Sequence, residues 1–198
     1  FQGNGGWRGA GSDIHRSPLA GRNFEYYSQD GVQAGIIAAA ASLGVTSKGI
    51  VTYVKHFFAN DQETMRADFG GIATWATEQT FREISAKPFE YIVKQGRATG
   101  LMSAFNRLGK QLSATNFAMH QRLLRDEWGF TGYTETDMWT KDYMPLNMMV
   151  RGGDQHLLSD HTSYAKNALD YGTWDATARS GKGMIKVAAN ASEYEHED

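Results

Sequence analysis

Two kinds of hydrophobic pattern alternate along the middle of the chain. Apolar residues recur at helical spacing in three stretches, residues 31–43, 76–95 and 115–128. A short apolar run follows each of them, and these runs predict strands over residues 49–58, 99–105 and 131–137. Strands that alternate with helices are typical of parallel α/β folds, either a doubly wound sheet or a barrel. The rhythm alone does not decide between these two.

The second predicted helix has one apolar face, and a proline is expected to interrupt its regular geometry. Its apolar residues Phe81, Ile84, Phe89, Ile92 and Val93 fall close to a single face that packs on a sheet. Pro88 lies among them, and proline removes a backbone donor and clashes with the preceding turn. We therefore expect a kink or an irregular segment near Pro88.

The pattern weakens towards the carboxyl end of the chain. Residues 153–158 predict a further strand, and residues 163–171 and 174–179 predict short helices. We expect residues 1–190 to form one domain, because 198 residues with 41% hydrophobic content bury one sizeable core. Residues 191–198 form a charged tail, which we expect to be a solvated end or a severed linker.

Composition narrows the possible partners. The chain has 20 basic and 22 acidic side chains, so its net charge of −2 favours neither nucleic acid nor an anionic membrane surface. The longest apolar stretch, residues 34–45, is shorter than the roughly 20 residues that cross a bilayer. The chain has no cysteine, which excludes disulfides and thiolate metal sites but leaves the compartment open. It begins at Phe1 rather than methionine, so we expect upstream sequence to be missing.

Polar residues gather where the predicted strands end. Each strand candidate is closed or followed by members of this set: Lys55, His56, Asn60, Asn106 and Asp137. The carboxyl ends of barrel strands form the active face. A site for a neutral sugar needs donors for its hydroxyls, a carboxylate to attack the anomeric carbon and an acid to protonate the leaving oxygen. Arg22, Lys55, His56 and Asp137 could fill every role except that of the acid.

Four ordered blocks resemble glycoside hydrolase family 3, specifically its β-glucosidase-like members. Residues 13–28 read DIHRSPLAGRNFEYYS, and residues 54–57 read VKHF and are followed by Asn60, Glu63 and Arg66. Residues 102–106 and 127–137 complete the set with MSAFN and EWGFTGYTETD. The resemblance extends from about Trp7 to about Leu158.

The resemblance implies a retaining β-glycosidase that releases terminal non-reducing sugars from a β-glucoside or oligosaccharide. Asp137 matches the catalytic nucleophile, which forms a covalent glycosyl-enzyme. Arg22, Lys55 and His56 match residues that hold the sugar, and Met102 matches a residue near the wall of that subsite. No cofactor is implied.

The resemblance also implies parts that this chain lacks. A (β/α)8 barrel takes about 250 residues. We therefore expect an incomplete TIM-type barrel, without about the first two β/α units of the family's N-terminal catalytic domain. In many relatives a C-terminal domain of the same protein supplies the acid/base. That residue is expected outside these 198 residues.

Three positions depart from the family pattern. Phe105 stands where most relatives have a tyrosine whose hydroxyl lies near the nucleophile. Trp139 is one position later than the usual tryptophan, which stacks on the aglycone side in relatives. Phe105 and Trp139 stay candidate substrate-binding residues. Glu135 makes the last strand more polar than a barrel wall usually is, and we expect it to pair with an arginine rather than to act as the acid.

Several competing interpretations stay open. The chain could be a non-catalytic carbohydrate-binding or scaffold fragment that kept the sugar-holding residues, and Arg22 could order its loop through Glu25. The glycine-rich residues 3–11 lack the strand and the Gly-Lys-Ser/Thr of a phosphate loop, so we predict no phosphate site there. Four acidic and histidine residues within 154–161 lack converging spacing, so no metal is predicted.

Overall fold

The computed structural model describes residues 6–66 and 72–137, together with Lys182. The strand and helices expected at 153–158, 163–171 and 174–179 lie outside the described residues, as do the tail 191–198 and Trp139. In the described part, no helix has both the length and the apolar character needed to cross a membrane.

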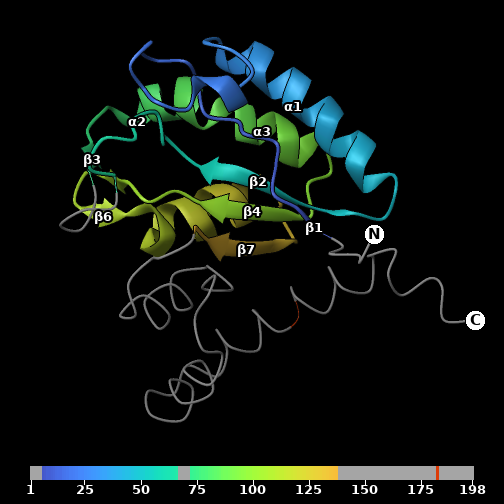
Figure 1. The fold of residues 1–198 in the computed structure, drawn as a ribbon. Coiled ribbons are helices and arrows are strands. Elements are labelled where there is room, and N and C mark those ends of the chain that lie inside the picture. The colour runs from blue at the N-terminus through green and yellow to red at the C-terminus, as the bar shows by residue number, and fades with distance from the viewer. Residues whose placement is uncertain (1–5, 67–71, 138–181, 183–198) are drawn as a thin grey trace, which may run out of the picture.

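A parallel sheet of four strands forms the centre of the molecule (Figure 1). Its spatial order is β1 (Gly6–Trp7), β2 (Val51–Phe57), β4 (Gly100–Ser103) and β7 (Tyr133–Thr136). Every neighbouring pair runs parallel. The predicted strands 49–58, 99–105 and 131–137 are therefore confirmed. Because they are parallel, their carboxyl ends meet at one edge of the sheet.

Helix α1 (Gly31–Thr46) follows the prediction for residues 31–43. Its first turn is capped by Asp30, whose side chain accepts a hydrogen bond from the backbone of Gln33 at 2.7 Å. Figure 1 shows α1 lying beside α3 (Lys87–Lys94) over the sheet. The two helices approach closely at Gly35, where an added Cβ would meet the Cβ of Tyr91 at 2.9 Å.

The predicted helix over residues 76–95 is broken, as its proline indicated. It consists of α2 (Glu78–Thr80), a π-helical segment (Phe81–Ser85) and α3, which has Pro88 in its first turn. Proline is tolerated there because the first N–H groups of a helix have no partner in the helix itself. The third predicted helix, 115–128, is a 3-10 turn (Ser113–Thr115) followed by a π-helix (Ala118–Glu127).

The hydrophobic core lies between the sheet and these helices. Phe57 of β2 is fully buried and packs against three other rings. Its ring centroid lies 5.2 Å from that of Phe89, 6.0 Å from that of His120 and 6.0 Å from that of Trp128. Its partners come from α3, from the π-helix and from the residue that ends that helix. Both helical layers therefore cover the same face of β2.

Two features were not predicted from the sequence. The strand β1 lies within the glycine-rich segment 3–11, for which no strand was predicted. A second sheet of three short strands, in the order β3 (Ala73–Thr74), β5 (Arg107–Leu108) and β6 (Gln111–Leu112), lies beyond the carboxyl ends of the main strands. Each of these four strands has two residues, too few to show an alternating pattern.

Candidate active site

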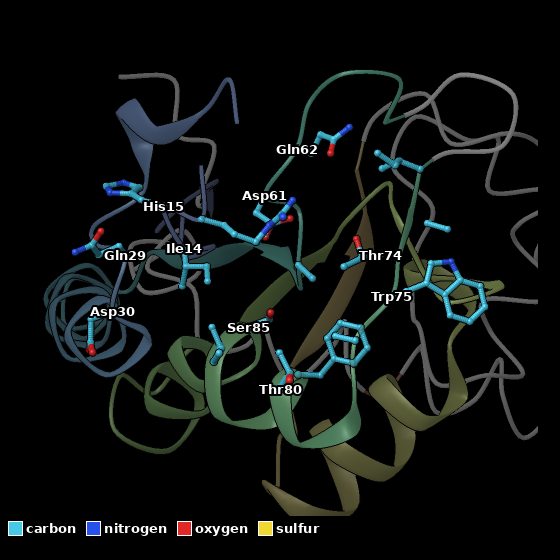
Figure 2. A pocket seen from close by; sticks show the side chains of 17 residues that line it. Ile14, His15, Gln29, Asp30, Asp61, Gln62, Thr74, Trp75, Thr80 and Ser85 are labelled. Atoms are coloured by element: carbon cyan, nitrogen blue, oxygen red, sulfur yellow. The ribbon is translucent and has the colours of Figure 1, made fainter. Parts of the chain in front are cut away.

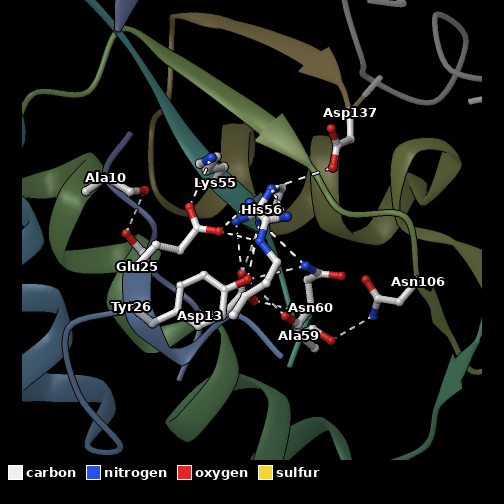
Figure 3. A network of polar contacts seen from close by, with 12 residues as sticks. Ala10, Asp13, Glu25, Tyr26, Lys55, His56, Ala59, Asn60, Asn106 and Asp137 are labelled. Carbon is white, nitrogen blue, oxygen red and sulfur yellow. Dashed lines mark hydrogen bonds and ion pairs between the residues drawn. The ribbon is translucent and has the colours of Figure 1, made fainter. Parts of the chain in front are cut away.

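The carboxyl ends of β2 and β7 bring the candidate residues together (Figure 3). Ser103 of β4 pairs with Thr136 of β7, so Asp137 leaves the sheet beside the end of β4. The Asp137 carboxylate is largely buried, and its Oδ2 lies 3.6 Å from His56 Nε2. The strand ends thus place a carboxylate and an imidazole from separate parts of the chain side by side.

Arg66 is the cation beside Asp137. Its Nη1 lies 3.5 Å from Asp137 Oδ2, and its Nε lies 2.8 Å from the Oε2 of Glu63. The guanidinium carbon lies 4.7 Å from the ring centroid of Phe105, a distance at which cation and aromatic face attract each other. The sequence identified Arg66 only as part of a motif. The structure adds it to the site and gives Phe105 a role in placing it.

Glu25 holds the other two cations of the site. Its carboxylate forms ion pairs with Arg22 and with Lys55, the second at 3.1 Å. Burial alone would raise the pKa of Glu25, but hydrogen bonds from Arg22 and Lys55 bring it below its ordinary value. The interpretation that Arg22 pairs with Glu25 is confirmed. Arg22 also reaches the site, since its Nη1 lies 3.1 Å from His56 Nε2.

Lys55 and His56 are neighbours in β2, yet both reach this cluster. On a regular strand, adjacent side chains point to opposite faces. The pairing of β2 with β4 shifts register between Val54 and Phe57, so the strand is irregular where these two residues lie. This irregularity allows both side chains to reach the cluster although β2 continues to Phe57.

His56 is buried and electrically neutral at ordinary pH. Burial lowers its pKa to about 3, and the charges of Arg22 and Lys55 act in the same direction, against the opposing carboxylates of Asp137 and Glu25. A neutral imidazole has one nitrogen that donates a hydrogen bond and one that accepts.

Asp13 is a buried residue beneath the site that the sequence did not single out. Only 1% of it is exposed, and its two oxygens accept the backbone N–H of His56 at 2.9 Å and of Asn60 at 2.8 Å. Burial raises its pKa to about 7, against the lowering effect of these hydrogen bonds. The adjacent residues run alongside β2, where Ser12 donates to the carbonyl of Lys55 at 2.7 Å. Asp13 therefore fixes the backbone on both sides of the β2 terminus.

Glu135 is paired with an arginine, as predicted. It is 3% exposed, and its Oε1 lies 3.4 Å from Arg8 Nε. Burial raises its pKa to about 7, although Arg8 opposes this shift. On the neighbouring strand Met102 pairs in register with Glu135 and is also buried.

A cavity of about 790 Å³ lies next to this cluster (Figure 2). Its wall includes Ile14, Thr74, Trp75 and the ion pair between Arg16 and Asp61. Neither Asp137 nor His56 lines it, so the cavity is separate from the carboxylate site. Among residues 6–66 and 72–137, no three potential ligands converge on a metal position. The acidic and histidine residues within 154–161 lie outside the described residues.

Comparison with known proteins gives consistent matches. Residues 12–150 match the glycosyl hydrolase family 3 N-terminal domain. The chain is 41% identical over 131 residues to a β-glucosidase of Ruminococcus albus, a match that covers 66% of this chain and 14% of that protein. It is 42% identical over 135 residues to an exo-α-(1→6)-L-arabinopyranosidase of Bifidobacterium longum, covering 68% of this chain and 17% of the relative.

Solved structures agree with the sequence matches. β-Glucosidase 3B from Thermotoga neapolitana in complex with α-D-glucose superposes with a TM-score of 0.88 and 30% identity, covering 96% of this chain and 28% of that one. A family 3 β-glucosidase from Bifidobacterium adolescentis gives a TM-score of 0.88 and 32% identity, over 98% of this chain and 29% of the other. The chain therefore spans less than a third of each of these relatives.

Proposed function

Because the chain belongs to glycosyl hydrolase family 3, through a match to its N-terminal domain over residues 12–150, we propose that it carries the nucleophile of a retaining β-glycosidase. The observation that supports this function best is the setting of Asp137. Its carboxylate stands at the end of a parallel strand, between the cation of Arg66 and the neutral ring of His56. A buried carboxylate held beside a guanidinium suits attack on an anomeric carbon.

The proposed reaction has two displacements. In the first, an Asp137 oxygen bonds to the anomeric carbon while the bond to the leaving oxygen breaks, and an acid gives that oxygen a proton. In the second, water attacks the anomeric carbon, the ester to Asp137 breaks, and the water's proton passes to the conjugate base of the same acid. Asp137 ends as the free carboxylate, and the sugar keeps its anomeric configuration.

The neighbouring residues would hold the sugar. Arg22 and Lys55 share Glu25, which keeps both cationic groups at the strand ends where they can donate to hydroxyls. Hydrogen bonds that strengthen as the anomeric carbon gains positive character would favour the transition state. We further propose Met102 and Phe105 as wall residues, together with Trp139, which lies outside the described part.

We propose that the parallel sheet belongs to an incomplete (β/α)8 barrel. Residues 1–190 would form part of the family's catalytic domain, without about its first two β/α units. The general acid/base would come from a C-terminal domain of the same protein. The small share of each relative that the chain covers, 14% of the Ruminococcus albus β-glucosidase for example, supports this assignment.

A mechanism-based label tests the nucleophile. A 2-deoxy-2-fluoroglucoside with a good leaving group should convert Asp137 to a stable ester, because the fluorine slows both displacements whereas the good leaving group speeds only the first. Mass spectrometry of the digested protein should find the added fluorosugar on the peptide that contains Asp137. Asp137→Asn should remove the label, whereas Glu135→Gln, two residues away, should keep it. A label on another residue would contradict the assignment.

The second candidate is a non-catalytic sugar-binding fragment. Phe105 favours it, because a tyrosine hydroxyl expected near the nucleophile is absent at this position. Such a protein would bind glucose in calorimetry and would leave the fluoroglucoside unreacted. Since relatives are named for both β-glucosides and α-L-arabinopyranosides, both sugars belong in these measurements.

A further inference from the structure

The two ring nitrogens of His56 have different neighbours. The side chain is almost entirely buried, so each ring nitrogen is restricted to the partners that surround it (Figure 3). Because burial keeps the ring neutral, only one nitrogen has a hydrogen. Which nitrogen has it decides whether the site receives a donor or an acceptor from His56.

The neighbours of Nε2 require this nitrogen to accept a hydrogen bond. Arg22 Nη1 lies 3.1 Å from Nε2, and a guanidinium donates but never accepts. A hydrogen on Nε2 would therefore set two donors against each other at hydrogen-bond distance. Asp137 Oδ2 lies at 3.6 Å from the same nitrogen, beyond the range of a hydrogen bond. The shorter contact therefore favours the form in which Nε2 keeps its lone pair.

The Nδ1 side offers acceptors. The nearest oxygen is the hydroxyl of Tyr26 at 3.4 Å, and Asp13 Oδ2 follows at 3.8 Å. Tyr26 donates its own hydrogen to the carbonyl of Asn60 at 3.1 Å, so its oxygen is left to accept. Burial raises the pKa of Tyr26, which keeps this hydroxyl protonated.

A second donor, the side-chain amide of Asn60, also lies near Nδ1. The side-chain nitrogen of Asn60 lies 3.5 Å from Nδ1, and an amide nitrogen cannot accept. Its two hydrogens already have closer partners, Glu63 Oε1 at 3.0 Å and Tyr26 Oη at 3.3 Å. The amide therefore leaves Nδ1 free to donate. Every hydrogen around the ring then has a partner in a single consistent arrangement.

We propose that His56 holds its proton on Nδ1, that Tyr26 is the positioning residue that keeps it there, and that Nε2 accepts a hydrogen bond from Arg22 instead of donating one to Asp137. The Nδ1 hydrogen points to Tyr26 Oη with Asp13 behind it, and Arg22 donates to Nε2.

This arrangement limits what His56 offers to a bound sugar, a consequence that rests on the proposed function. Nε2 has no hydrogen to donate to a sugar hydroxyl, and its one lone pair already accepts from Arg22. His56 also gives no proton to Asp137, whose carboxylate is paired with Arg66.

The proton position can be measured without turnover. The full chain, labelled with nitrogen-15 in its 6 histidines, gives ring spectra in which a protonated and an unprotonated nitrogen resonate far apart. His56→Gln identifies the signals of His56. We expect a one-bond hydrogen coupling on Nδ1, none on Nε2, and a nuclear Overhauser effect from the Nδ1 hydrogen to the ring of Tyr26. The pattern should not change between about pH 5 and 8, where a free histidine would titrate.

Tyr26→Phe then tests the positioning role. Without the hydroxyl, Nδ1 loses its nearest acceptor, and both nitrogens should move to intermediate shifts that report a mixture of the two forms. Tyr27→Phe removes a hydroxyl from the next residue and should leave the His56 pattern unchanged. Far-ultraviolet circular dichroism checks that both variants are folded, and if Tyr26→Phe does not fold, the spectrum of the unaltered chain still tests the proton position.

A coupled hydrogen on Nε2 in the unaltered chain would overturn the proposal. A folded Tyr26→Phe variant with the original pattern would overturn the role of Tyr26. Neither result depends on glycosidase activity. Absence of the fluorosugar label together with a protonated Nδ1 would refute the proposed function alone.

Discussion

Burial shifts the pKa values of Asp13 and His56 in opposite directions. The pKa of Asp13 rises from 3.8 to about 7, so the folded protein holds this proton over a range in which the unfolded chain has lost it. Its contribution to stability is complete below about pH 4 and is lost as the pH rises to about 7. For His56, whose pKa falls from 6.5 to about 3, stability is instead lost as the pH falls through that range.

Asp13→Asn should therefore flatten the decline in stability with rising pH. An amide is neutral at every pH, so the variant no longer loses stability when the pH rises from about 4 to 7. While only the unfolded chain ionises, each such carboxyl changes the free energy of unfolding by up to about 1.4 kcal/mol per pH unit. Urea unfolding at several pH values measures the slope.

A control for this experiment lies on the surface. Asp126 is well exposed and pairs with Arg122, so Asp126→Asn makes the same chemical change without a buried charge. Its curve should run parallel to that of the unaltered chain. Equal slopes for Asp13→Asn and the unaltered chain would show that Asp13 stays ionised in the folded protein.

The sequence indicated the residues at strand ends but not the residue that supports them. Lys55, His56 and Asp137 could be predicted because each follows an apolar run, and parallel strands bring such positions together. Asp13 lies in a segment without any such run. Its burial depends on that segment lying alongside β2, where Gly11 forms a parallel bridge with Lys55 and the backbone N–H of Ser12 donates to the Lys55 carbonyl at 2.7 Å. A contact of that kind has no local pattern in the sequence.

At the scale of elements, two glycines of helix α1 have contrasting surroundings. Gly35 faces α3, where an added Cβ would lie 2.9 Å from Tyr91 Cβ and 3.1 Å from Pro88 Cα. Gly44 is exposed, and an added Cβ would meet nothing within 4 Å. The same substitution in one helix therefore separates helix propensity from packing between helices.

Gly44→Ala should stabilise the protein, and Gly35→Ala should destabilise it. Alanine in an open helical position is favoured over glycine by about 0.5–1 kcal/mol. At Gly35 the same gain is outweighed by overpacking, which typically costs about 1–3 kcal/mol as α1 and α3 are pushed apart. Thermal and urea unfolding measure both changes. Stabilisation by both variants would mean that α1 and α3 do not pack as closely as described.

Elements were predictable where the hydrophobic pattern was long enough. β2, β4, β7 and α1 have continuous runs or clear spacing, and the break near Pro88 followed from the chemistry of proline. Strands of two residues have no such signal, and they form through pairing with distant parts of the chain. The π-helical form of 118–127 was also missed, since its apolar spacing resembles that of an α-helix.

At the scale of the whole molecule, the strand order bears on the type of α/β fold. The four parallel strands follow one another in chain order, and the described sheet has no point at which the order reverses. Helices on both sides and a reversal of order are typical of doubly wound sheets. Here α3 and the π-helix both contact Phe57, so they cover one face of β2. This arrangement supports the proposed barrel, which the alternating pattern alone did not establish.

We proposed that this chain carries the nucleophile and that the general acid lies in another part of a longer protein. Two substrates with different leaving groups test this division. A glycosidase without its general acid still reacts with a glycoside whose leaving group needs no proton, and it reacts slowly with one that does. The chain should therefore release dinitrophenol from a dinitrophenyl β-glucoside in a burst of about one equivalent, and then turn over slowly.

The unactivated substrate and an added nucleophile complete this test. Phenyl β-glucoside should react at least about a hundredfold more slowly than the dinitrophenyl compound, since acid catalysis typically contributes that much or more. Azide needs no base to attack the glycosyl-enzyme, so it should speed the slow phase and yield the β-glycosyl azide. Absorbance at the dinitrophenolate band follows both phases, and Asp137→Asn should abolish the burst. Similar rates for the two glucosides would place the acid within this chain.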